Sequence, residues 1–128
     1  MSYFVSKKLA MNFENALTRV TEELKKEGFG VLTEIDVKAT LKKKLDVDFR
    51  KYTILGACNP TYAYQALQAE PHIETMLPCN VIVQELAEGD VEVAAVNPLA
   101  SMQAIQNQAL QSIATEIQAK LQRVIAQL

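Results

Sequence analysis

The feature that most constrains the fold is one long apolar stripe near the C-terminal end of the chain. From Leu110 onward its members recur at steps of three and four, the spacing of one helical face; with Ile105, which precedes them, they are Ile105, Leu110, Ile113, Ile117, Leu121, Val124, Ile125 and Leu128. The stripe predicts a helix of about 26 residues, roughly 40 Å long, with Asn97–Pro98 or Ser101 as its start signal. The opposite face is mostly glutamine, so one side of this helix is predicted to be buried.

Short apolar runs elsewhere in the chain predict five strands. In chain order they are residues 3–7, 29–37, 52–58, 79–86 and 91–96. The last two runs flank a Gly-containing turn and therefore predict a hairpin. In the second run, simple alternation places Val31, Ile35 and Val37 on one face, with Leu32, Glu34 and Asp36 on the other.

Three further helices are predicted between these strands. The first begins after Asn12, a favourable N-cap, and ends at Gly28, which tolerates the left-handed conformation that ends helices. Residues 38–45 predict a short surface helix, and residues 61–70 predict a helix that starts at Asn59–Pro60 and stops before a second proline.

The order of elements predicts the fold class and an assembly. Strand, helix, four strands with short helical insertions and a long final helix indicate an α+β protein with an antiparallel sheet. Its helices pack on one face, and residues 1–128 form a single domain. Much of the remaining strand content is apolar, so the other face is predicted to be shared with a second copy in a symmetric homodimer.

Composition argues against several kinds of partner. The net charge is −2 and the isoelectric point about 5.4, whereas nucleic-acid binders usually present a basic face. The N-terminal residues lack the pattern of a signal peptide, and no run reaches the ~18 apolar residues of a membrane helix. We therefore expect a cytoplasmic protein with neither a nucleic-acid nor a membrane partner. Its two cysteines are then reduced thiols, metal ligands or redox centres rather than a structural disulfide.

The two cysteines mark the candidate site. Cys58 ends one apolar run and Cys79 begins another, and an asparagine follows each of them. If the two strands are antiparallel neighbours with the cysteines directly opposed, their Cα atoms lie ~4.5–5.5 Å apart. The sequence thus predicts a small-molecule site near the last helix, formed by Cys58, Asn59, Cys79, Asn80 and Met102. An N-cap role would also explain Asn59.

Three interpretations of the cysteine pair remain open. With His72, the single histidine, the thiols would suit a zinc or copper ion. As a dithiol or nucleophile they would make the protein a redox protein or enzyme. As small buried hydrophobes they would only pack, in a structural or interaction module. Glu34 and Asp36, two residues apart on one strand, are a further acid–base candidate, although solvent exposure or lysine pairing explains them as well.

Four motifs together resemble one known family. They are Glu34-Ile-Asp36, Leu55-Gly-Ala-Cys-Asn-Pro60, Leu77-Pro-Cys-Asn80, and Asn97-Pro98 with Met102. Their order over nearly the whole chain is similar to that of the small prokaryotic family called domain of unknown function 302. The resemblance implies a compact homodimer with a strand-helix-four-strand-helix core of the helix-grip or TBP-like kind. It implies no established reaction.

Overall fold

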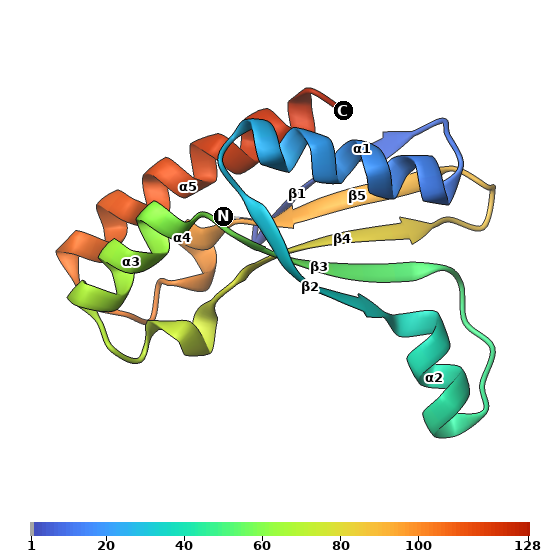
Figure 1. The fold of residues 1–128 in the computed structure, drawn as a ribbon, viewed down its shortest axis with the longest axis horizontal. Coiled ribbons are helices and arrows are strands. Elements are labelled where there is room, and N and C mark those ends of the chain that lie inside the picture. The colour runs from blue at the N-terminus through green and yellow to red at the C-terminus, as the bar shows by residue number, and fades with distance from the viewer. Residues whose placement is uncertain (1) are drawn as a thin grey trace.

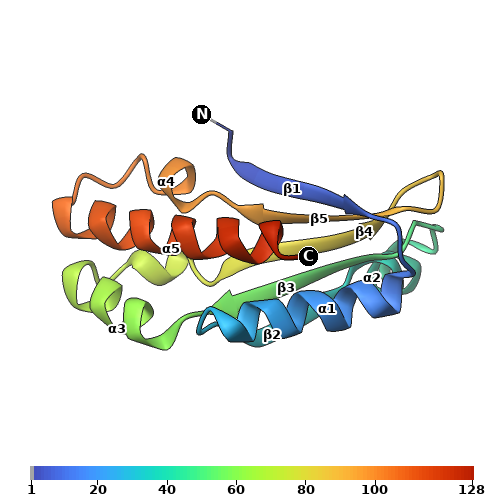
Figure 2. The ribbon, with the colours of Figure 1, turned by 90° about the horizontal axis from the view of Figure 1, so that it is seen from above.

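A five-stranded antiparallel sheet, with two helices on one face, forms the body of the protein (Figures 1 and 2). The computed structural model describes residues 2–128. Across the sheet the strands run in the order β1-β5-β4-β3-β2. Their bounds are β1 Phe4–Leu9, β2 Gly30–Asp36, β3 Tyr52–Cys58, β4 Cys79–Glu85 and β5 Val91–Val96. The predicted α+β class and antiparallel sheet are confirmed.

The helices connect these strands or follow them. They are α1 Phe13–Lys26, α2 Val37–Leu45, α3 Pro60–Ala69, the 3-10 turn η1 Ile73–Met76, α4 Pro98–Ser101 and α5 Gln108–Ala126. The side chain of Asn12 caps α1 by accepting a hydrogen bond from the Asn15 amide at 2.8 Å. After α1, Gly28 takes a positive φ of 88°, and the Phe29 amide donates back to the Leu24 carbonyl. Both ends of this helix form as predicted.

The main core lies between the sheet and the pair α1 and α5. Alternate residues of the central strands point toward these helices, and Val81, Val83 and Val93 are fully buried. They meet the apolar stripes of the two helices, which include Val20 and Leu121. Burying side chains of this size stabilises the fold by about 1.5–3 kcal/mol each. The predicted packing of the C-terminal helix on the sheet is therefore confirmed.

The start of that helix was predicted wrongly. Residues 98–101 form the separate turn α4, and α5 begins only at Gln108 and runs for 19 residues. The break is stabilised by Asn107, whose Oδ1 accepts from the Ala109 amide at 3.0 Å and whose Nδ2 donates to the Ala69 carbonyl at 3.0 Å. Ile105 keeps its apolar role from the connecting segment, where it packs against a second buried cluster.

That second cluster forms where α5 extends past the end of the sheet, as Figure 2 shows. It is built on Ala66 of α3, Ile73 of η1 and Leu110 of α5, all almost completely buried. The C-terminal half of α5 thus covers the sheet, while its N-terminal half covers α3 and η1. A junction between two separately packed clusters results.

A β-bulge in β2 makes the predicted alternation of side chains wrong. The pairing register with β3 shifts between Val31 and Thr33. Val31 therefore lies opposite Ala57, on the helix-covered side, whereas Ile35 lies opposite Ile54, on the other side. An extra residue in one strand reverses which face the following side chains occupy, so Val31 and Ile35 do not share a face.

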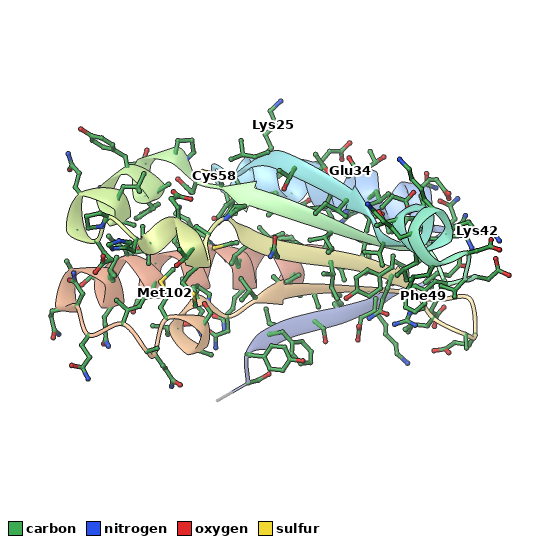
Figure 3. The ribbon with its side chains drawn as sticks, turned by 90° about the horizontal axis from the view of Figure 1, so that it is seen from below. Lys25, Glu34, Lys42, Phe49, Cys58 and Met102 are labelled. Carbon is green, nitrogen blue, oxygen red and sulfur yellow. The ribbon has the colours of Figure 1, made fainter. Side chains whose placement is uncertain are left out.

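The second face of the sheet is covered by no helix of residues 2–128 (Figure 3). One row across it pairs Ile35, Ile54, Ile82 and Ala94 in register. Helix α2 lies beyond one end of the sheet, on this uncovered side (Figure 1), and none of its residues is buried. Within the described part of the chain, no helix combines the length and apolar character that crossing a membrane requires.

Candidate functional site

The two cysteines lie at the same end of neighbouring strands, because β3 pairs with β4. The predicted direct opposition is nevertheless wrong by one residue, since Cys79 lies opposite Ala57. Side chains alternate between the faces of a strand, so this offset sends the two Cβ atoms to opposite faces. Two thiols that point apart do not form a disulfide without backbone movement, and both cysteines are free.

Both cysteines still line one cavity of about 100 Å³. It opens at the junction where α5 leaves the sheet and approaches α3. The sheet contributes Ala57 and the two cysteines, and α5 contributes Ile113 and Ile117. Further lining residues are Tyr62, Ala63 and Ala66 from α3, Glu74 and Leu77 from the η1 region, and Met102. The wall is therefore almost wholly apolar.

The thiols in this wall are protonated at neutral pH. Burial, with a smaller contribution from the neighbouring Cys58 thiol, raises the pKa of Cys79 from its ordinary value of 9.0 to about 12. Burial likewise raises the pKa of the Cys58 thiol, to which the negative charge of Glu74 adds. The thiolate is the nucleophilic and metal-binding form of cysteine. Neutral thiols instead behave as small, weakly polar wall groups.

Asn59 does not cap α3 as predicted. Its side chain makes no capping hydrogen bond; instead, Nδ2 donates to the Glu27 carbonyl at the end of α1, at 3.2 Å. Because a carbonyl only accepts, this bond fixes which end of the amide is the nitrogen. Asn59 is 9% exposed and lines the cavity. Its side chain thus joins the end of α1 to the start of α3 beside the cavity.

The other predicted ligand-binding residues separate into two places. Met102 lines the cavity with Cys58, Asn59 and Cys79, and Figure 3 shows Cys58 and Met102 toward the same end of the molecule. Asn80 is exposed and borders a groove on the uncovered face of the sheet. The one-residue step from Cys79 to Asn80 reverses the face, so the structure does not bring Asn80 to the cavity.

The structure does not bring the three predicted metal ligands, Cys58, Cys79 and His72, together. His72 is separated from the thiols: its side chain is 89% exposed, and Nδ1 lies 3.4 Å from a Glu70 oxygen. Within residues 2–128, no three side chains of His, Cys, Asp or Glu are grouped to hold a metal ion. The carboxylates of Glu34 and Asp36 are exposed and away from the cavity. Asp36 caps α2 by accepting from the Ala39 amide at 2.9 Å.

Most of the lining residues were not predicted from the sequence, and two of them, Glu74 and Tyr62, have polar groups. Glu74 lies in η1 and Tyr62 lies in α3. The ammonium of Lys120 lies over the Tyr62 ring, 5.9 Å from the ring centre. Neither Glu74 nor Tyr62 stands in a recognisable motif, and both reach the cavity only because η1 and α3 fold back against α5. Spacing along the chain carries no signal for such a contact between distant segments.

Fold and cavity together define a small α+β protein whose antiparallel sheet carries a long C-terminal helix. Over residues 5–128 the sequence matches the family described as Domain of unknown function DUF302, and the chain belongs to that family. It is similar to an uncharacterized conserved DUF302 protein from Bacillus stearothermophilus, known from a crystal structure. The two share 27% sequence identity and a TM-score of 0.90 over 98% of each chain. No curated protein matches the sequence.

Proposed function

We propose that this protein binds a small, largely apolar molecule in the cavity beside Cys58 and Cys79. The observation that carries the proposal is the cavity itself, which remains open between two well-packed clusters. Protein interiors are otherwise close-packed, with few voids larger than a water molecule. A dry cavity of about 150 Å³ suffices to hold the six carbons of benzene, so the present cavity of about 100 Å³ suits a molecule with a body of about four carbons.

The neutral thiols support binding over thiol chemistry. With the Cys79 pKa near 12, very little thiolate exists at neutral pH to attack a substrate or a disulfide. An uncharged thiol in an apolar wall instead offers a polarisable contact surface. Cys58 and Cys79 would therefore shape the cavity, with Met102 closing it from the segment after α4.

Filling the cavity tests this proposal. Ala63→Leu adds an isobutyl group to a lining position of α3, whereas Gln68→Leu adds apolar volume to an exposed position of the same helix. Titration of n-butanol, followed by backbone amide shifts, should give saturable changes at the lining residues of the wild type and of Gln68→Leu. Ala63→Leu should abolish them. Equal saturable shifts in all three proteins would refute binding in this cavity.

We also propose that a second copy of the chain covers the open face of the sheet. The in-register row of Ile35, Ile54, Ile82 and Ala94 supports this, because it is an apolar band on a face without helices. Five strands of six or seven residues present a footprint of about 24 by 20 Å, or roughly 500 Å². A standard stable interface buries about 800 Å² per partner. The arm formed by α2, which lies on the same side, would contribute the rest (Figure 1).

Light scattering of the purified protein tests the homodimer. The wild type should show twice the mass of the chain, and Ile82→Lys should show a monomer, because it places a charge in the middle of the apolar row. Thr115→Lys, on the exposed face of α5, should leave the dimer intact. A wild-type protein that is monomeric at micromolar concentration would exclude this assembly.

A further inference from the structure

We infer that the ligand of the cavity carries a positively charged, hydrogen-bond-donating head on its apolar body, as a small primary alkylammonium ion does. This inference rests on the proposed binding in the cavity and names the class of molecule that fits its polar groups. Two side chains carry it: the amide oxygen of Asn59 and the carboxylate of Glu74. Both line the cavity, and both are hydrogen-bond acceptors.

The Asn59 oxygen is a fixed acceptor without a partner in the described part of the chain. The amide nitrogen donates to the Glu27 carbonyl, so Oδ1 is the atom of the amide that remains to accept a hydrogen bond from a ligand. Within residues 2–128, no fully buried side-chain oxygen or nitrogen lacks a partner. Since Oδ1 makes no hydrogen bond there, it must be open to the space beside it. Asn59 is itself only 9% exposed and is one of the residues that line the cavity, so we infer that Oδ1 faces the cavity.

Glu74 supplies the charge. It is the single charged side chain among the described residues that line the cavity. Its carboxylate is close enough to Cys58 to help hold the pKa of that thiol above its ordinary range. The ammonium of Lys120 lies 5.9 Å from the ring centre of Tyr62, a lining residue, but Lys120 itself is not part of the lining. The cavity therefore presents a negative charge to its contents.

These acceptors discriminate between classes of ligand. An ammonium head has three donors and no acceptor, and would satisfy Asn59 Oδ1 and Glu74 together while its alkyl chain lies against Ile113 and Ile117. A carboxylate head would face the Glu74 charge and an oxygen that cannot donate to it. A neutral alcohol has one donor, which can reach only one of the two acceptors at a time, and it carries no charge to attract the Glu74 carboxylate. Hydrogen bonds assisted by charge are about twice as strong as neutral ones.

Three molecules of matched size test the inference: n-butylammonium, n-butanol and butyrate, each titrated at neutral pH and followed by the amide shifts of the lining residues. Because Glu74 is solvent-exposed, the charge effect is screened; n-butylammonium should bind about fivefold more tightly than n-butanol, and butyrate most weakly. Glu74→Gln should bring n-butylammonium and n-butanol to equal affinity. Glu116→Gln, which removes an exposed charge from the outer face of α5, should preserve the difference.

A second readout follows the charge directly. Bound n-butylammonium should lower the pKa of Cys58, measured by thiolate absorbance, because it opposes the effect of Glu74; n-butanol should not. Equal binding of n-butanol and n-butylammonium, or tighter binding of butyrate, would overturn the ammonium preference and leave the cavity as a general apolar site. Absence of saturable shifts with all three molecules would overturn the proposed binding function as well.

Discussion

The buried thiol of Cys79 gives a prediction that connects the cavity to stability. In the folded protein its pKa is about 12, against an ordinary value of 9.0 that applies once the chain unfolds. Between these values the unfolded chain releases the thiol proton and the folded chain retains it. The folded state then binds more protons, so the free energy of unfolding must fall as the pH rises. Below pH 9.0 both states are protonated, and the effect is absent.

The size of the loss follows from the distance between the two pKa values. One pH unit within that interval corresponds to about 1.4 kcal/mol. Raising the pH from about 8 to about 10.5 should therefore lower the free energy of unfolding by about 2 kcal/mol through Cys79. Lysines and tyrosines titrate in the same range, so the effect must be read as a difference between two proteins.

Urea unfolding under reducing conditions provides the assay, with Cys79→Ala as the reference protein. Both proteins should lose stability on going to about pH 10.5, and the wild type should lose about 2 kcal/mol more. Cys58→Ala keeps the more deeply buried thiol and should retain most of the wild-type loss, because burial is the largest cause of the raised Cys79 pKa. Equal losses in the wild type and Cys79→Ala would show that Cys79 ionises as freely in the fold as outside it, and the account of neutral wall thiols would be wrong.

Substitutions at Gly56, Asn59 and Asn107, with controls for the first two, test the local packing. Gly56→Ala should destabilise the protein by about 1–3 kcal/mol, because a Cβ there would collide with the hydroxyl of Thr33, whereas Gly30→Ala meets no atom within 4 Å and should be neutral in thermal unfolding. Asn59→Ala should lower the unfolding free energy by about 1–2 kcal/mol; Asn59→Asp should not rescue it, since a carboxylate cannot donate to a carbonyl. Asn107→Ala should remove the cap of α5 and lower stability by about 1 kcal/mol in urea unfolding, with early loss of helical circular dichroism if α5 frays first.

Local sequence patterns were sufficient to predict most of the helices and strands. The third and fifth strands have the predicted bounds of residues 52–58 and 91–96. The cap at Asn12 and the positive φ at Gly28 also follow from neighbouring residues alone. Such signals depend on hydrogen bonds and backbone conformations within a few residues, so they are present in the sequence regardless of the rest of the fold.

The predictions from sequence were wrong where a contact between two distant segments determines the local structure. Asn59 looks like a helix cap, but its side chain makes no capping hydrogen bond to α3; it is oriented instead by Nδ2, which donates to the carbonyl of Glu27 at the end of α1. The apolar stripe of the last helix continues back to Ile105, yet the chain turns between α4 and α5 because the side chain of Asn107 bonds across to α3. The strand pattern around Val31 gave no sign of the bulge that the pairing with β3 contains.

Pairing between strands also decided the candidate site. The sequence by itself placed Cys58 and Cys79 at the ends of two apolar runs, and this predicted that they would lie near each other. Only the tertiary structure set the register, in which Cys79 faces Ala57. A strand has a period of two residues, so a shift of one residue exchanges its faces. The spacing of apolar residues determines where strands and helices form, but packing of whole elements determines the register, and with it which side chains surround the cavity.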